Sequence, residues 1–228
     1  AKNHAADILA AQFNISQADA KQSIDNVRLA THGDNQNFFG LNPLYKGITG
    51  EALYTRMSNV YRGLGYIEGK VPNFRIISYP DAVKATALNG PQHNAESQKG
   101  FEVATASERT KEAVATKRVS ITFPSGQYRL DENAKYIVDK EMVDLAKAFA
   151  GARIRVEGNT DDVGNPASNK ALSLRRAQSV VDYLVSQHGM QRNRFIVVGN
   201  GSDNPVESND TESGKSKNRR TDFELVED

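Results

Sequence analysis

The second half of the chain alternates between short apolar runs and longer amphipathic segments, as α/β domains do. Val119–Phe123 alternates apolar and polar residues with a period of two, so we predict the first strand there. Helix, strand, helix, strand, a loop or helix, and a final strand follow. The helices and strands among them are predicted over 131–150, 153–157, 168–187, 195–198 and 221–226. We therefore predict an α/β (α+β) sandwich of βαβαβ-(α)-β order, with one mixed sheet and helices on one face.

The first 84 residues carry apolar side chains at helical spacing instead. Ser16, followed three residues later by Asp19, is predicted to cap a helix. The Asn- and Gly-rich residues 34–43 are predicted to form a loop, and Ile76–Ile77 a short β-like run. We predict a mainly helical segment, with helices over 1–13, 16–29 and 50–64.

Residues 85–112 join these two regions and are polar and interrupted by Gly and Pro, as a linker is. We therefore predict a helical segment over 1–84, a linker over 85–112 and an α/β domain over 113–228. The total of 228 residues suits one large domain or two small ones.

Composition narrows the class of protein. A formal net charge of +1 lacks the basic excess of a nucleic-acid-binding protein. Without Cys, the chain has no disulfide framework, thiol nucleophile or Cys-ligated metal. No apolar run approaches the roughly 18–20 residues that span a bilayer. Ala1-Lys2-Asn3-His4 has neither initiator Met nor apolar h-region, so we expect a mature product, a fragment or a designed chain.

The stretch from Val156 to Leu184 is the strongest candidate for a binding site. A strand runs into a polar loop and then a helix, whose first turn offers free N–H donors and the positive end of the helix dipole. Asp161 lies in the loop and Arg176 two turns into the helix. A carboxylate and a forked guanidinium side by side suit a zwitterionic ligand.

A helical wheel at 100° per residue orients that helix. Leu174, Val181 and Val185 are predicted to form its core stripe. Asn169 and Arg176 nearly coincide, about 200–220° from the stripe, and are predicted to face outward near the loop. The alternative is that Asp161 and Arg176 only bridge each other or cap the helix.

Two blocks of this region resemble the OmpA-like peptidoglycan-binding family, over about residues 113–228. The first block is Gly158-Asn159-Thr160-Asp161-Asp162-Val163-Gly164, Asn169 and Leu172-Ser173-Leu174-Arg175-Arg176-Ala177. The second is Gly199-Asn200-Gly201-Ser202-Asp203-Asn204-Pro205-Val206, Asn209-Asp210, Gly214 and Asn218-Arg219-Arg220. Asn159 departs from the family's usual His, and Lys215 from its usual Arg.

The resemblance implies noncovalent anchoring to the cell wall through diaminopimelate, the cross-bridge amino acid of Gram-negative peptidoglycan. Asp161 would take its ammonium group and Arg176 its carboxylate. Thr160, Asn169 and Arg220 complete the predicted site. One Arg of the run at 218–220 would either bond the stem peptide or, as we favour, hold the loop of Asp161. Asn159 is expected to buttress that loop less well than His.

The same resemblance implies a protein of the periplasm, associated with the cell wall or the outer membrane. No cofactor, metal or nucleic-acid partner is expected. We expect no enzyme, because none of the four His residues lies near a Ser or a carboxylate pair in a nucleophile arrangement.

Part of the helical segment resembles the closing portion of periplasmic solute-binding proteins of the nitrate/sulfonate class. Asp34-Asn35, Phe38-Phe39, Tyr61 and Gly65 carry this resemblance. It implies a small-molecule solute and a membrane transporter as partners, and hence a solute-binding module tethered to the wall. A helical subdomain without a ligand is the favoured alternative for residues 1–84. The alternative for the whole chain is an ABC-transporter-type solute receptor whose C-terminal domain mainly serves oligomerisation.

Overall fold

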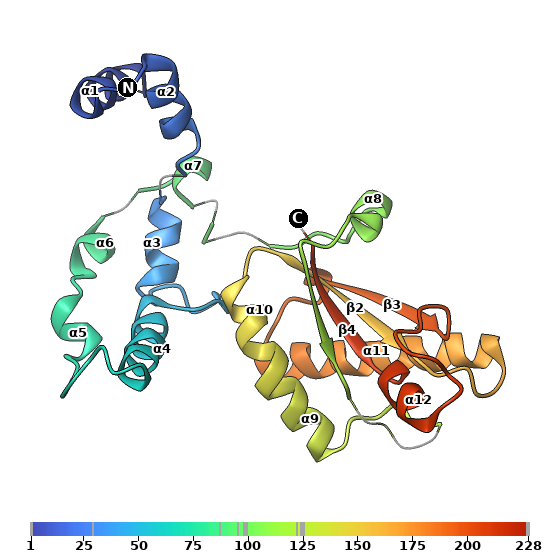
Figure 1. Ribbon diagram of the computed structural model, residues 1–228. Helices are drawn as coiled ribbons and strands as arrows, with labels where there is room; N and C mark the ends of the chain where they lie inside the picture. Colours follow the sequence, from blue (N-terminus) through green and yellow to red (C-terminus); the bar gives the residue numbers. More distant parts are fainter. Residues whose placement is uncertain are drawn as a thin grey trace.

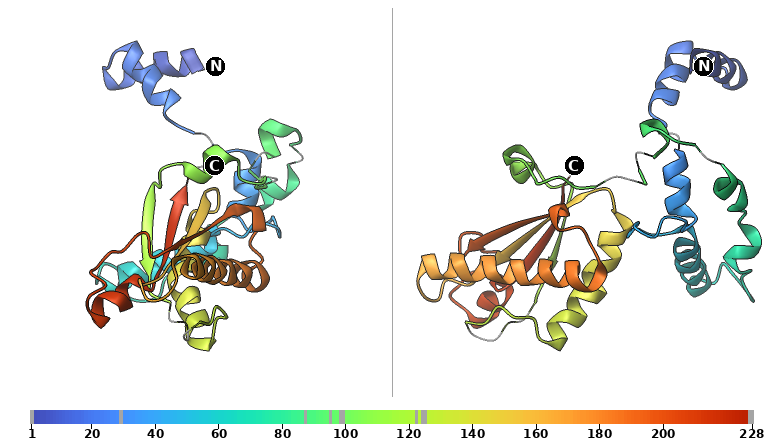
Figure 2. Two further views of the ribbon diagram at one scale, coloured as in Figure 1. Left: turned by 90° about the vertical axis from the view of Figure 1, so that its right-hand side faces the viewer. Right: turned by 180° about the vertical axis from the view of Figure 1, so that it is seen from behind.

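The protein, seen in a computed structural model, has a helical first part and an α/β second part (Figure 1). Helices α1 to α7 lie to one side of the sheet, beyond the α10 end of the α/β part (Figure 2). In the part of the chain described, no helix is both long and apolar enough to cross a membrane. The described residues are 2–28, 30–86, 88–94, 96–97, 100–121, 123 and 126–226.

One mixed sheet holds the α/β part together. Its strands lie in the order β1-β4-β2-β3, with β2 and β3 parallel and the other neighbours antiparallel. Val156 stands opposite Phe223 on one side and Val197 on the other. The predicted mixed sheet is therefore confirmed. The strands are β1 (Ala115–Val119), β2 (Arg153–Asn159), β3 (Phe195–Gly201) and β4 (Thr221–Val226).

Helices cover one face of this sheet, as predicted (Figures 1 and 2). The predicted helix over 131–150 is a continuous helical stretch with a π-helical turn, η1, in its middle. Side chains from these helices, including Val138, Met142 and Val180, pack against Val156 and Phe223 of the sheet in one apolar core. The elements are α9 (Glu132–Val138), η1 (Asp139–Val143), α10 (Asp144–Ala148), α11 (Pro166–His188), η2 (Arg192–Arg194) and α12 (Glu212–Asn218).

The first strand begins four residues earlier than predicted, at Ala115, and ends at Val119. The reason is its partner: β4 begins at Thr221, which pairs with Val119, so later residues have no strand beside them. Ile121 is nevertheless buried, which explains the misleading alternation. Thr122, within the predicted strand, lies outside the described residues.

The predicted core stripe of α11 is confirmed at Val181, which is buried, and at Val185, which packs against the core, but it is wrong at Leu174. Leu174 is 46% exposed, whereas Asn169 and Arg176, expected to face outward, are both buried. Two glycines of the sheet leave room for the backbone of α11 to come close, and the helix turns its small residues toward them. A Cβ on Gly158 would lie 2.1 Å from the Ser173 carbonyl oxygen, and one on Gly199 would lie 2.5 Å from the Leu174 nitrogen. The buried residues are Asn169, Ser173, Arg176, Ala177, Val180, Val181 and Leu184.

The other face of the sheet is polar. Arg155 of β2 pairs with Glu224 through Nε at 2.7 Å and with Glu157 at 3.0 Å. Its Nη1 also donates to the carbonyl oxygens of Arg109 and Lys111, at 3.2 and 2.8 Å. Helix α8 (Ala106–Thr110) is tied to the sheet by these bonds.

The helical first part begins with the predicted pair of helices. Ser16 caps the second, since its hydroxyl accepts a hydrogen bond from the Asp19 nitrogen at 3.0 Å. The helix predicted over 50–64 is also confirmed. The helices are α1 (Lys2–Phe13), α2 (Gln17–Asp25), α3 (His32–Phe38), α4 (Gly50–Gly63), α5 (Phe74–Ile77), α6 (Asp81–Ala85) and α7 (Pro91–Asn94).

Two predictions for this part are wrong. Residues 34–43 are not all loop, because Thr31 and Asp34 form a capping box that starts α3. The Thr31 nitrogen donates to Asp34 at 2.7 Å, and the Asp34 nitrogen donates to Thr31 at 3.2 Å. Ile76–Ile77 is not β-like but belongs to α5, which Asn73 caps by accepting from the Arg75 nitrogen at 2.9 Å.

Candidate functional site

The loop between β2 and α11 is folded tightly back on the helix start. Asn165 caps α11, since its side-chain oxygen accepts from the nitrogens of Ala167 and Ser168 at 2.9 and 3.2 Å. In the first turn, the Asn169 amide donates to the Val163 carbonyl at 3.0 Å and to the Asp161 carbonyl at 3.4 Å. These bonds fix the backbone that presents Asp161.

The Asp161 carboxylate pairs with Arg219. Arg219 Nη1 lies 2.7 Å from Asp161 Oδ2, and Arg219 Nη2 lies 2.7 Å from Glu212 of α12. Among the described residues, the other Asp161 oxygen accepts one long hydrogen bond, 3.3 Å, from the Val163 nitrogen. Hydrogen bonds that Arg219 donates to both carboxylates, first of all to Asp161, raise its pKa above the usual value. Asp161 is therefore held in place while one of its oxygens stays weakly engaged.

Arg176 lies on the same helix as Asn169, under a cover from the segment before α9. Its Nε donates to the Gln127 carbonyl at 3.1 Å, and its guanidinium stacks over the Phe123 ring at 4.9 Å. Burial lowers the pKa of Arg176, the charge of Asp161 opposes that shift, and the charge of Arg219 adds to it. Asp161 and Arg176 thus influence each other electrostatically.

No ion pair joins Asp161 to Arg176, so the alternative that they bridge each other is wrong. Among the described residues, Arg176 makes its one hydrogen bond through Nε, which leaves both Nη groups as donors. Sequence reasoning missed Phe123 and Gln127 as the cover of Arg176. Gln127 lies 49 positions before Arg176 in the sequence, and no sequence pattern indicates that the two residues are in contact.

Thr160 precedes Asp161 and is buried, with 4% of its surface exposed. Its nitrogen donates to the Gly201 carbonyl at 2.8 Å, which ties the end of β2 to the end of β3. Its hydroxyl has no hydrogen-bond partner among the residues described. A buried polar group without a partner costs free energy, so this hydroxyl is an available hydrogen-bonding group at the loop.

Arg220 points into the protein and not to the Asp161 carboxylate. Its guanidinium pairs with Asp222 at 2.9 Å and donates to the Asn204 carbonyl at 3.0 Å, and both charged side chains are buried. Asp222 also accepts from the Asn159 amide at 3.2 Å. Asn200 in turn donates to the Asn159 side-chain oxygen at 3.2 Å. Asn159 is therefore bonded at both ends of its amide, behind the loop.

Comparison with known proteins covers the same part of the chain. Residues 122–219 match the model of the OmpA family. An OmpA-like domain spans these residues. Outer membrane porin F of Pseudomonas aeruginosa is 36% identical over 108 residues, which cover 47% of this chain and 31% of that protein. Peptidoglycan-binding protein ArfA of Mycobacterium bovis is 40% identical over 90 residues, which cover 40% of this chain and 27% of that protein.

One solved structure is similar to part of this chain. The peptidoglycan-associated lipoprotein from Burkholderia pseudomallei matches 47% of this chain and 88% of its own, with 25% identity and a TM-score of 0.41. The chain matches less than a third of the length of porin F and of ArfA.

The OmpA-like domain therefore brings one carboxylate and one buried guanidinium to the same strand-loop-helix unit. Asp161, Thr160, Asn169 and Arg176 belong to this unit, whereas Arg220 stands behind it. One Arg of the run at 218–220 was expected to hold the loop, and Arg219 does so. Within the described residues, no three His, Asp or Glu side chains cluster as metal ligands would.

Proposed function

We propose that the OmpA-like domain binds peptidoglycan without a covalent bond and anchors the chain to the cell wall. The family match over residues 122–219 and the likeness to a protein named as peptidoglycan-binding support this. The likeness to an outer membrane porin supports a location in the periplasm, at the wall beside the outer membrane. Anchoring requires binding and no catalysis.

We propose further that the group recognised is the free amino-acid end of diaminopimelate. This rests on two groups of the same strand-loop-helix unit. Arg219 holds the Asp161 carboxylate in place, and the Arg176 guanidinium keeps both Nη groups free of hydrogen bonds in the described structure. The ligand ammonium would bind the weakly engaged Asp161 oxygen, because Arg219 occupies the other. The ligand carboxylate would bind the Arg176 Nη groups, in the forked geometry that guanidinium favours.

The other predicted site residues would support binding of the diaminopimelate head group in different ways. The Thr160 hydroxyl would gain a partner from the ligand or from the loop as it binds, because it has none among the described residues. Asn169 would act as a positioning residue, since its amide holds the carbonyls of Asp161 and Val163. Arg220 would support the loop from behind through Asp222 and Asn159.

Sedimentation with purified diaminopimelate-type sacculi tests this proposal. Asp161→Ala and Arg176→Ala should each abolish co-sedimentation, because each removes one of the two charges that hold the head group. Matched controls are their neighbours, Asp162→Ala and Arg175→Ala, which should sediment like the unaltered protein. Equal retention of all four variants would rule out the site.

The solute-binding role of residues 1–84 remains a second proposal, resting on the resemblance of Asp34-Asn35, Phe38-Phe39, Tyr61 and Gly65. In this reading the wall anchor tethers a module that captures a solute for a transporter; alternatively, the chain is a receptor whose OmpA-like domain serves oligomerisation. Calorimetry against nitrate and small sulfonates tests solute capture, and absence of heat with all of them would count against it. A monomer in sedimentation equilibrium would count against the oligomerisation alternative.

A further inference from the structure

A cavity of about 930 Å³ lies between the helical first part and the OmpA-like domain. Cavities of roughly 300–1,000 Å³ accommodate drug-sized molecules. The walls come from α3 and the loop after it on one side, and from the end of α10 and the residues before β3 on the other. A backbone hydrogen bond connects the two parts beside the cavity, since the Ile48 nitrogen donates to the Lys147 carbonyl at 3.1 Å.

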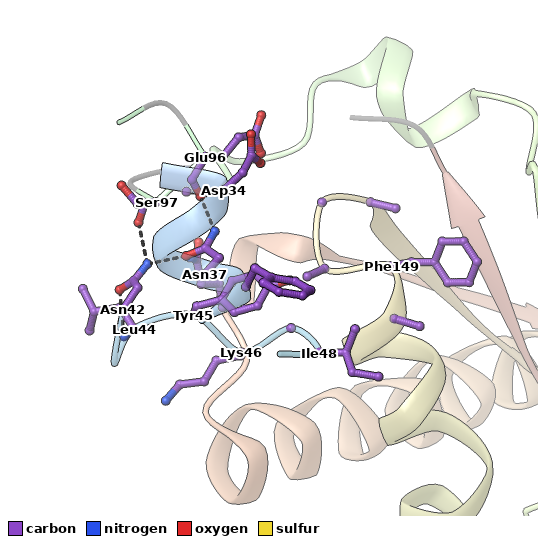
Figure 3. A pocket seen from close by; sticks show the side chains of 18 of the residues that line it. Asp34, Asn37, Asn42, Leu44, Tyr45, Lys46, Ile48, Glu96, Ser97 and Phe149 are labelled. Carbon is purple, nitrogen blue, oxygen red and sulfur yellow. Dashed lines mark hydrogen bonds between the residues drawn. The ribbon is translucent and has the colours of Figure 1, made fainter. Parts of the chain in front are cut away.

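The cavity has polar ends and an aromatic middle (Figure 3). Asp34 and Glu96 lie together at one end, Lys46 and Ile48 lie at the other, and Tyr45 lies between them (Figure 3). Phe38 and Phe101 also line it, whereas the ring of Phe149, another lining residue, points away from Tyr45 (Figure 3). The lining therefore offers apolar surface for the body of a ligand and charged groups for its ends.

The two carboxylates at the first end are already engaged. Arg28 lies 2.8 Å from Asp34 and 3.1 Å from Glu96. Hydrogen bonds from Arg28 and Thr31 outweigh burial and lower the pKa of Asp34, which keeps it charged. Among the described lining residues, Arg28, Lys46 and Arg194 give three cations against the two carboxylates of Asp34 and Glu96.

Arg194 is a buried cation of this lining, whereas Arg28 and Lys46 are exposed. Arg194 is 4% exposed, and its hydrogen bonds within the described structure go to backbone carbonyls and to no carboxylate. Nε donates to Ala152, and Nη2 donates to Ala146 and Phe149, at 2.7–2.9 Å. Nη1 donates to no described group, and the Phe101 ring lies 5.8 Å from the guanidinium. A buried cation without a counter-charge is costly and is relieved by an anion.

Two further donors lie in the same lining. Gln191 uses its side-chain oxygen to accept from the Phe101 nitrogen at 2.9 Å, and its amide N–H groups donate to no group in the described part of the chain. The Tyr45 hydroxyl lies against Gly47, where an added Cβ would be 2.1 Å from it. Burial raises the pKa of Tyr45, and the charge of Arg194 lowers it, so Tyr45 and Arg194 lie within electrostatic range.

We propose that this cavity is a second binding site, for a small organic carboxylate with an aromatic or cyclic apolar body. The carboxylate binds Arg194 Nη1, with the Tyr45 hydroxyl and the Gln191 amide as further donors. The body packs between Phe38 and Phe101. The site stands apart from the wall-binding loop, so either proposal can fail without the other.

Calorimetry of the full chain with three probes of one shape tests the charge preference. Phenylacetate, phenylacetamide and phenethylammonium share the aromatic body and differ in the charge at its end. Phenylacetate should bind at least about tenfold more tightly than phenylacetamide, because charge-assisted hydrogen bonds are stronger than neutral ones. Phenethylammonium should bind weakest. No binding of phenylacetate, or equal binding of all three probes, would overturn the proposal.

A pair of matched variants locates the site. Tyr45→Phe should weaken phenylacetate binding about three- to tenfold, because it removes one hydroxyl donor and keeps the ring. Tyr128→Phe, which changes a ring stacked on Arg175 far along the chain, should leave it unchanged. Amide chemical-shift changes on adding phenylacetate should centre on Gly47, Ala150 and Gln191. Equal effects of the two variants, or shifts centred on the loop of Asp161, would contradict the location.

Discussion

Asp161 and Arg219 form an ion pair across 58 positions of sequence, with 2.7 Å between Oδ2 and Nη1. This pair gives the candidate site its geometry. Asp161 sits in a loop, and loop side chains sample many conformations unless another group holds them. Because Arg219 holds one oxygen of the Asp161 carboxylate, it limits the orientations that this side chain can take.

We predict that Arg219→Ala weakens binding to sacculi about three- to tenfold without abolishing it, because Asp161 would keep its charge but lose its fixed orientation. Glu212→Ala is the control, since it leaves the bond to Asp161 in place and should change binding little. Binding curves measured by co-sedimentation give the comparison. Tighter binding by Arg219→Ala would mean that Arg219 competes with the ligand ammonium and does not position Asp161.

The close approach of α11 to the sheet predicts that Gly158→Ala destabilises the domain strongly. The added Cβ would meet the Ser173 carbonyl at 2.1 Å, and backbone on both sides leaves no flexible side chain to move away. We expect a loss of about 2–3 kcal/mol in the free energy of unfolding, the upper range for overpacking. Urea denaturation measures it, with Gly63→Ala as a control because a Cβ there meets nothing within 4 Å. Equal stability of both variants would contradict the packing described.

The buried pair of Arg220 and Asp222 makes a separate prediction. Asp222→Ala should destabilise the domain by about 3–5 kcal/mol, since it leaves a buried guanidinium without a counter-charge. Replacing both residues together, Arg220→Met with Asp222→Leu, should cost less than that single change. Urea denaturation of the single and double variants checks this. A double variant no more stable than Asp222→Ala would show that the pair contributes more than charge neutralisation.

The capping box of α3 predicts a dependence on acid. Burial opposes ionisation of Asp34, but bonds from Arg28 and Thr31 outweigh it and lower its pKa. Because the folded-state pKa is lowered, this contribution is present above the unfolded-state pKa, near 3.8, and is lost as the pH falls through the lower folded-state value. Protection factors for hydrogen exchange in α3, which correct for the intrinsic effect of pH, should therefore fall at acid pH. Asp34→Asn should remove this pH dependence, and its persistence in the variant would refute the assignment.

The sequence predicted the two strands with neighbours on both sides, β4 and β2, better than the edge strand β1. The final strand was predicted over 221–226 and has these bounds, with Phe223 and Leu225 in the core. Strand β1 was misplaced because its length depends on where β4 begins, which alternation alone does not contain.

The predicted orientation of α11 was wrong at Leu174, Asn169 and Arg176 for a related reason. A helical wheel weighs the side chains of the helix, whereas Gly158 and Gly199 on the sheet decide how close each turn can come. Ser173 therefore faces the sheet while Leu174 stays half exposed.

The candidate site was predictable in its loop and helix residues, because they lie within one short stretch of sequence. Its partners were not. Arg219, Phe123 and Gln127 come from distant segments, and only the fold brings them to Asp161 and Arg176. The resemblance nevertheless indicated that an Arg of the run at 218–220 would hold the loop.

The central claim is that one carboxylate and one guanidinium grip the two charges of a diaminopimelate head group. Calorimetry with two soluble stem tripeptides tests it most directly, one ending in diaminopimelate and the other in lysine, which has the ammonium but lacks the second carboxylate. We predict that the unaltered protein binds the diaminopimelate peptide at least about tenfold more tightly, and that Arg176→Ala removes this preference while Arg175→Ala keeps it. Equal affinity for both peptides, or an unchanged preference in Arg176→Ala, would contradict the account.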